Sequence, residues 1–154
     1  MIEQGKLEPK DPDFENRVRA NFTQQRVMSL IGAELITIEP GIVEIAIRMD
    51  DDLTQQNGFM HAGIVTTILD SACGYAAYTL MPAASSVLSV EFKVNLLSPA
   101  IGERIIARAE VKRAGKLLTV CTADAIADGK ICATMLATMI CREAKADKNL
   151  APKT

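Results

Sequence analysis

One long stretch almost without charge, residues 57–81, constrains the fold of this 154-residue chain more than any other feature. Between Ala62 and Val90 the only charged residue is Asp70. A run of roughly twenty mostly apolar residues is too long for one strand and favours a helix. A helix that is apolar on all sides is a buried helix. The sequence therefore predicts a central buried helix with a carboxylate in its middle.

The carboxylate of Asp70 has two interpretations at this point. An unpaired buried carboxylate is costly in free energy or has a raised pKa, and ionisable groups held in such places are often functional. The alternative is structural, with the carboxylate accepting hydrogen bonds from backbone N–H groups of a neighbouring element. His61, the only histidine, directly precedes the stretch.

Length and composition exclude several classes of protein. The length predicts one domain with a real core. A net charge of -2, no tryptophan and no basic patch with aromatic residues argue against nucleic acid as a partner. The N-terminus has no secretory signal, and Asp70 interrupts the longest apolar run, so we expect no membrane span.

The four cysteines form no C-x-x-C pair, which argues against zinc. They are Cys73, Cys121, Cys132 and Cys141. We expect free thiols in a cytoplasmic protein.

The chain divides into three parts. Residues 1–12 are polar with two prolines and predict a flexible arm, and the charged residues 143–154 predict a flexible tail. Residues 13–142 form the single domain. Asp13 is expected to cap a helix that runs to about Leu30, with Gln25 and its neighbours facing water.

Alternating apolar residues predict six strands, two before and four after the central helix. The expected strands are 33–38, 42–48, 87–97, 105–112, 117–127 and 131–141. In the third, alternation predicts Leu88, Val90, Phe92, Val94 and Leu96 on one face and Ser89 on the other. A two-residue turn at 128–129 pairs Cys121 with Leu136 and Cys132 with Ala125, so these cysteines are not cross-strand neighbours.

This element order is typical of an α+β protein in which an antiparallel sheet packs on one helix. One flat sheet cannot cover a helix that is apolar all round. We therefore expect a strongly curved sheet wrapped around the helix, with a second copy of the chain covering what remains open.

Several ordered motifs resemble the PaaI-like acyl-CoA thioesterases, which have the hotdog fold. They are H-A-G at 61–63, Asp70 nine residues after the histidine, S-V-E-F-K-V-N-L-L-S-P-A at 89–100, and R-x-G-K at 113–116. The similarity extends over roughly residues 31–142. It implies an acyl-CoA thioesterase that forms dimers, which often pair into tetramers.

The resemblance also implies roles for five residues. Asp70 matches the helix carboxylate that acts as nucleophile or general base. Ala62 supplies a backbone N–H that polarises the thioester carbonyl, and many relatives have glycine there. His61 supports that loop and contacts the thioester, and Ser89 helps to hold the attacking water. Gln55 stands six residues before the histidine, where the family often has asparagine.

Four further residues are expected to bind substrate. Gly63 is the last residue of the H-A-G motif, and Asn57 lies four residues before this motif. Arg113 and Lys116 can contact the phosphates of coenzyme A, although basic residues beside a turn are also often only solvated.

Helix geometry supports a site shared between two chains. Ala62 is at the start of the helix, where backbone N–H groups are free and the dipole favours a developing oxyanion. Asp70 is eight residues further, about 12 Å along a helix at 1.5 Å per residue. One thioester carbon cannot touch both residues of one chain, so we expect Ala62 and His61 from one protomer and Asp70 and Ser89 from its partner.

The expected reaction is hydrolysis of a medium-chain or aryl-acetyl CoA to coenzyme A and a carboxylic acid, without a metal or other cofactor. Two alternatives remain open. One is a hotdog hydratase or dehydratase acting on an enoyl thioester. The other is a protein that binds acyl-CoA without turnover.

Overall fold

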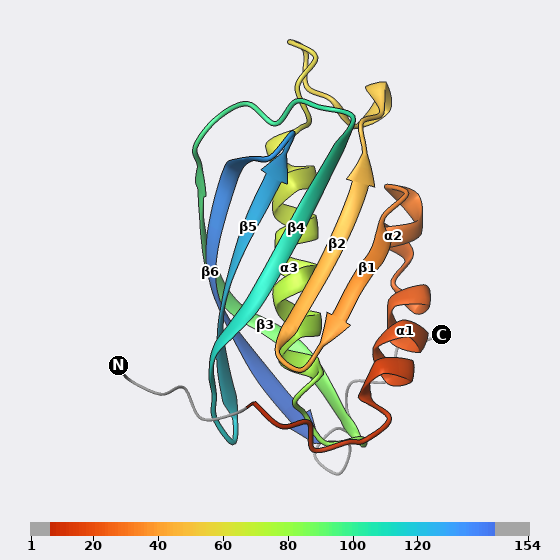
Figure 1. The fold of residues 1–154 in the computed structure, drawn as a ribbon, viewed down its shortest axis with the longest axis vertical. Coiled ribbons are helices and arrows are strands. Elements are labelled where there is room, and N and C mark those ends of the chain that lie inside the picture. Colours follow the sequence, from red (N-terminus) through yellow and green to blue (C-terminus); the bar gives the residue numbers. More distant parts are fainter. Residues whose placement is uncertain (1–6, 144–154) are drawn as a thin grey trace, which may run out of the picture.

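A long helix, α3 (Ala62–Tyr78), lies along the concave side of a curved six-stranded sheet in the computed structural model, which describes residues 7–143 (Figure 1). The other elements are α1 (Phe14–Gln24), α2 (Arg26–Leu30), β1 (Glu34–Glu39), β2 (Ile42–Arg48), a short 3-10 turn (Asp51–Leu53), β3 (Ser85–Leu96), β4 (Arg104–Ala114), β5 (Leu118–Ala127) and β6 (Lys130–Glu143). The expected α+β arrangement is thus confirmed. No helix within residues 7–143 combines the length and apolar character needed to cross a bilayer.

All strand pairs are antiparallel, in the order β1-β2-β4-β5-β6-β3. The face against α3 is rich in small buried side chains, which let the thick helix approach the sheet closely. These include Ala107, Ala109, Cys121, Ala123, Ala125, Ala133 and Ala137. The strands β1 and β3 form the two edges of the sheet within the described chain.

The N-terminal helix is broken, so the prediction of one helix from Asp13 to Leu30 is wrong. Helix α1 ends at Gln24 and α2 begins at Arg26, because Gln25 has an extended backbone with φ -79° and ψ 94°. Asp13 occupies the N-cap position, but its carboxylate accepts from Asn16 Nδ2 at 2.7 Å instead of capping the backbone. The break directs the side chain of Gln25 toward α3, where its Oε1 accepts hydrogen bonds from Tyr75 and Ser71.

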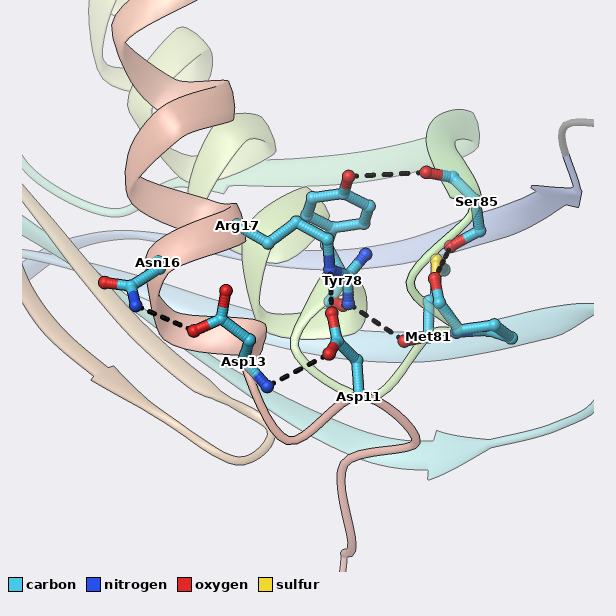
Figure 2. Close-up of polar contacts among 8 residues, drawn as sticks. Asp11, Asp13, Asn16, Arg17, Tyr78, Met81 and Ser85 are labelled. Carbon is cyan, nitrogen blue, oxygen red and sulfur yellow. Dashed lines mark hydrogen bonds and ion pairs between the residues drawn. The ribbon is translucent and has the colours of Figure 1, made fainter.

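A largely buried arginine, with a side chain 13% exposed, ties α1 to the C-terminal end of α3 (Figure 2). Arg17 Nη2 donates to the carbonyl oxygens of Tyr78 at 3.1 Å and Met81 at 2.9 Å. Its guanidinium lies 4.1 Å from the centroid of the Tyr78 ring, and its Nε lies 2.8 Å from Asp11 Oδ2. Carbonyl groups that end a helix lack partners within it, so this contact satisfies them and fixes the end of α3.

The described part of the N-terminal segment, from Leu7 onward, contacts the body of the domain. Leu7 packs against the core and Asp11 is buried. Residues 1–6 of the expected arm, and the expected tail after Glu143, lie outside the described residues.

A β-bulge in β3 overturns the predicted alternation of that strand. Ser89 pairs with Met139 and Glu91 with Thr138, which leaves Val90 as the extra residue. Ser89 therefore shares the helix-facing side of the sheet with Phe92, whereas Leu88 lies on the outer side. Bulges re-aim side chains in this way, and they are frequent next to active sites.

A second irregularity shifts the register of the β5–β6 hairpin by one residue from the predicted one. Cys121 pairs with Ala137 rather than Leu136, and Cys132 stands at the register shift without a direct partner. The expectation that no disulfide forms is confirmed, because all four thiols are free. Burial raises the pKa of the Cys121 thiol to about 12, so this thiol stays protonated and unreactive at neutral pH.

One face of α3 is not covered, so the prediction of a helix buried all round is wrong along one stripe. Gly63, Thr67, Asp70 and Gly74 follow one another at helical spacing and are all at least partly exposed. Asp70 is accordingly half-buried rather than fully buried. The stripe gives this carboxylate access from outside the protomer.

Candidate active site

Asp70 and Ser89 lie side by side, as the resemblance implies. Ser89 Oγ donates a hydrogen bond of 2.6 Å to Asp70 Oδ1. The pairing depends on the bulge at Val90, which turns Ser89 toward α3. Hydrogen bonds to an ionised carboxylate are short and strong, so Ser89 fixes one oxygen of Asp70 and leaves Oδ2 for another partner.

A small polar pocket of ≈ 120 Å³ opens beside this carboxylate. Its lining consists of Asn21, Gln25, Asp70, Ser71, Gly74, Tyr75, Val87 and Ser89. Tyr75 OH donates toward Asn21 Oδ1 at 3.1 Å and Gln25 Oε1 at 3.3 Å, and Ser71 Oγ donates to Gln25 Oε1 at 3.5 Å. Burial raises the pKa of Tyr75 to about 12, so its phenol remains a hydrogen-bond donor at neutral pH.

The sequence interpretation missed Gln25 and Asn21 as pocket residues. Gln25 was expected to face water as part of a continuous helix. Its half-buried side chain instead contacts α3 because the backbone leaves the helical conformation at this residue. Tyr75 is only 4% exposed and lines the same pocket.

His61, Ala62 and Gln55 come together at the other end of the helix. His61 is the N-cap of α3, and its Nδ1 accepts from the N–H of Gly63 at 2.9 Å. Because Nδ1 is the acceptor, the neutral ring carries its proton on Nε2. The loop is held by bonds from His61 N to Leu53 O at 2.9 Å and from Met60 N to Ala100 O at 3.0 Å.

The backbone N–H of Ala62 is unpartnered within residues 7–143. It is the first residue of α3, where an N–H has no acceptor in its own helix. Ala62 and Gln55 line a largely apolar hollow of ≈ 400 Å³ that also includes Met60, Val65 and Leu96. The arrangement presents one N–H donor, at the positive end of the helix, to a cavity suited to an apolar group.

Gly63 leaves space for the His61 ring that forms the cap. A Cβ at this position would lie 3.0 Å from Nδ1 and 3.3 Å from Cε1 of His61, closer than ordinary van der Waals contact. Asn57 is exposed at the tip of the loop, and its N–H donates to Gln55 Oε1. This bond fixes the side-chain oxygen of Gln55 and leaves its amide N–H groups for the hollow.

Arg113 and Lys116 are exposed near the β4–β5 turn, close to the C-terminal end of α3 (Figure 1). Lys116 lines a hollow of ≈ 530 Å³ together with Leu7, Lys10 and Leu80. His61 and Ala62 are at the opposite end of the same helix. Within one chain, therefore, the basic pair, the Asp70 pocket and the Ala62 hollow are three separate places.

A family model described as the thioesterase superfamily matches residues 57–134. This chain has 51% sequence identity to a thioesterase family protein from Silicibacter pomeroyi. The crystal structure of that protein matches this one with a TM-score of 0.82, covering 84% of this chain and 98% of that one. Human acyl-coenzyme A thioesterase 13 is 30% identical over 101 residues, which are 65% of this chain and 70% of the human protein. The E. coli PaaI protein, at 15% identity and a TM-score of 0.77 over 83% of this chain and 92% of that one, has the same fold.

The fold and the site thus define a hotdog-fold thioester hydrolase. The chain belongs to the thioesterase superfamily, as its family model over residues 57–134 shows, and the hotdog fold and thioester hydrolase activity expected from the sequence are confirmed.

Proposed function

We propose that this protein hydrolyses acyl-CoA thioesters to coenzyme A and a carboxylic acid, with a medium-chain or aryl-acetyl group as the acyl part. The observation that carries the proposal is the Asp70–Ser89 pair, bonded at 2.6 Å on the open stripe of α3 and bordering a polar pocket. A positioned carboxylate beside a space for water is what thioester hydrolysis requires. The relative named acyl-coenzyme A thioesterase 13 supports coenzyme A as the thiol.

The proposed site is complete only in a dimer. Ala62 and Asp70 are eight residues apart on one helix, about 12 Å at 1.5 Å per residue, which exceeds the reach of one thioester group. Strand β3 is a free edge of twelve residues, and its helix-facing side chains Phe92 and Leu96 are 43% and 58% exposed. Free edges and exposed apolar side chains favour association with a second strand. A partner related by a two-fold axis along β3 covers these residues and brings its own Ala62 to Asp70.

A pairing of dimers into a tetramer is proposed on the outer side of the sheet. Leu88, Leu118 and Leu136 are exposed there, on three neighbouring strands. Exposed leucines on adjacent strands provide an apolar surface suited to another sheet.

In the proposed reaction, the Ala62 N–H of one protomer donates to the thioester carbonyl oxygen. Negative charge develops on this oxygen in the transition state, at the positive end of α3. Asp70 of the other protomer either removes a proton from water or attacks the carbonyl carbon itself. When water attacks, the C–S bond breaks, the acid forms directly, and Asp70 passes the proton to the departing thiolate of coenzyme A. When Asp70 attacks, the C–S bond breaks to leave an anhydride on Asp70, the thiolate takes a proton from water, and a second water hydrolyses the anhydride to the acid and free Asp70. These steps use water and groups of the protein only.

The remaining residues are assigned to binding. Nε2–H of His61 and the amide of Gln55 face the thioester, and Gly63 and Asn57 shape the loop around it. Arg113 and Lys116 contact the phosphates of coenzyme A as charge-assisted donors.

The test is thiol release from short, medium, long and aryl-acetyl CoA esters by wild type and Asp70→Asn. Asp124→Asn, on the outer side of β5, is the matched control. We expect a loss of about a hundredfold or more in kcat for Asp70→Asn and none for the control. Absence of turnover on every ester, with tight acyl-CoA binding, would replace this proposal with a binding protein. Loss of enoyl thioester absorbance without thiol release would indicate a hydratase.

A further inference from the structure

The amide of Gln25 lies beside the catalytic carboxylate without a role in the reaction described above. Gln25 is the extended residue between α1 and α2, and the break directs its side chain to α3. Its Oε1 accepts from Tyr75 OH at 3.3 Å and from Ser71 Oγ at 3.5 Å. Tyr75 has one hydroxyl proton and shares it with Asn21 Oδ1 at 3.1 Å, and these contacts together orient the amide with Oε1 toward α3.

With Oε1 engaged, the two Nε2–H donors of Gln25 are the free part of the amide. Neither meets an acceptor among residues 7–143. Gln25 lines the ≈ 120 Å³ pocket together with Asp70 and Ser89. An amide donor and a carboxylate acceptor therefore face the same small polar space.

The size and chemistry of this pocket suit water rather than an acyl group. A volume of ≈ 120 Å³ has room for water molecules but is small for an acyl chain. Six of its eight lining residues carry polar side chains, so a water there has several partners. The apolar hollow beside Ala62, at ≈ 400 Å³, is the better place for an apolar acyl group.

We propose that this pocket holds the hydrolytic water and that Gln25 is the positioning residue that orients it. Nε2–H of Gln25 donates to one lone pair of the water, and the water donates a proton to Asp70 Oδ2, the oxygen that Ser89 leaves free. The second lone pair then forms the bond to the carbonyl carbon and the proton passes to Asp70. As the C–S bond breaks, Asp70 gives this proton to the departing thiolate, which restores the carboxylate and leaves the carboxylic acid. The inference rests on the proposed thioesterase function, in its general-base form.

The experiment compares Gln25→Met with wild type on the best acyl-CoA ester, in water and in water with added methanol. Methionine matches the length of glutamine and removes both polar groups. Gln24→Met, one residue away and exposed, is the matched control. Because an oriented water is lost, we expect kcat to fall about 10- to 100-fold with KM unchanged. We also expect the ratio of methyl ester to acid to rise, because methanol can attack the thioester about as readily as a water molecule that is no longer held in place.

Tyr75→Phe provides a second variant should Gln25→Met fail to fold, since it keeps the ring and removes the phenol that holds Oε1. It should change kcat and the product ratio in the same direction by a smaller factor. Folded variants with wild-type kcat and product ratio would overturn the role of Gln25 while leaving the thioesterase proposal intact. Wild type without turnover on any ester would instead overturn the thioesterase function itself.

Discussion

Replacing Ala62 with proline removes one N–H from the proposed site and leaves the helix able to form. Ala62 is the first residue of α3, the position where proline is favoured because its missing N–H has no helical acceptor. Proline also restricts the preceding residue to an extended conformation. His61 already has φ -60° and ψ 133°, so the backbone accepts the change without rearrangement.

The expected loss follows from the chemistry of an oxyanion donor. Removal of one such donor lowers kcat by about 10²- to 10³-fold, or about 2.7–4 kcal/mol of transition-state stabilisation. The charge on the carbonyl oxygen develops only in the transition state, so we expect KM to change little. Thiol release measured under saturating acyl-CoA gives kcat, and thermal unfolding verifies that the variant is folded.

Ala62→Gly is the matched control, because it changes the same side chain and keeps the N–H. It should retain kcat within a few-fold of wild type. A folded Ala62→Pro variant with wild-type kcat would refute the assignment of this N–H to the thioester carbonyl.

Three further variants test other parts of the structure. Gly63→Ala places a Cβ 3.0 Å from His61 Nδ1, so we expect the ring to be displaced and the N-cap to be weakened. Loss of the cap should lower the free energy of unfolding by about 1 kcal/mol, and calorimetry should show a lower melting temperature. Arg17→Met removes one partner of a largely buried ion pair, so the free energy of unfolding measured in urea should fall by about 3 kcal/mol. Arg19→Met, in an exposed ion pair, should lower it by less than about 1 kcal/mol. Equal losses in the two variants would contradict the role of Arg17. Lys116→Gln removes a proposed contact to the phosphates of coenzyme A, so KM should rise several-fold while kcat stays unchanged. The difference in KM between wild type and variant should shrink at high salt, because salt screens this contact. An unchanged KM would exclude a phosphate contact.

The parts of the fold set by periodic patterns were predictable from the sequence. The apolar stretch around Asp70 predicted α3, and alternation predicted six strands close to their observed bounds. These elements depend on which residues avoid water, which a single sequence reveals. The separation of Ala62 from Asp70 also followed from helix geometry alone.

The parts set by local irregularities were not predictable. The bulge at Val90 moved Ser89 to the helix-facing side, and simple alternation carries no signal for an added residue. The extended backbone at Gln25 had no glycine or proline to mark it, so the helix was expected to continue. The open stripe of α3 arises because a curved sheet with two free edges surrounds only part of a helix. All three features meet at the Asp70 pocket.

The central claim is that two chains build each active site, and one mixed dimer tests it most directly. Asp70→Asn and Ala62→Pro chains with different tags are co-expressed, and the heterodimer is purified through both tags. In a shared site, one of the two sites contains both defects and the other contains neither.

A shared site therefore predicts that the heterodimer, built from two inactive parents, recovers about half the kcat of wild type per dimer. Each parent homodimer remains at least about a hundredfold below wild type in the same assay. A heterodimer as inactive as its parents, or a wild-type protein that stays monomeric near 16.6 kDa, would contradict the shared site.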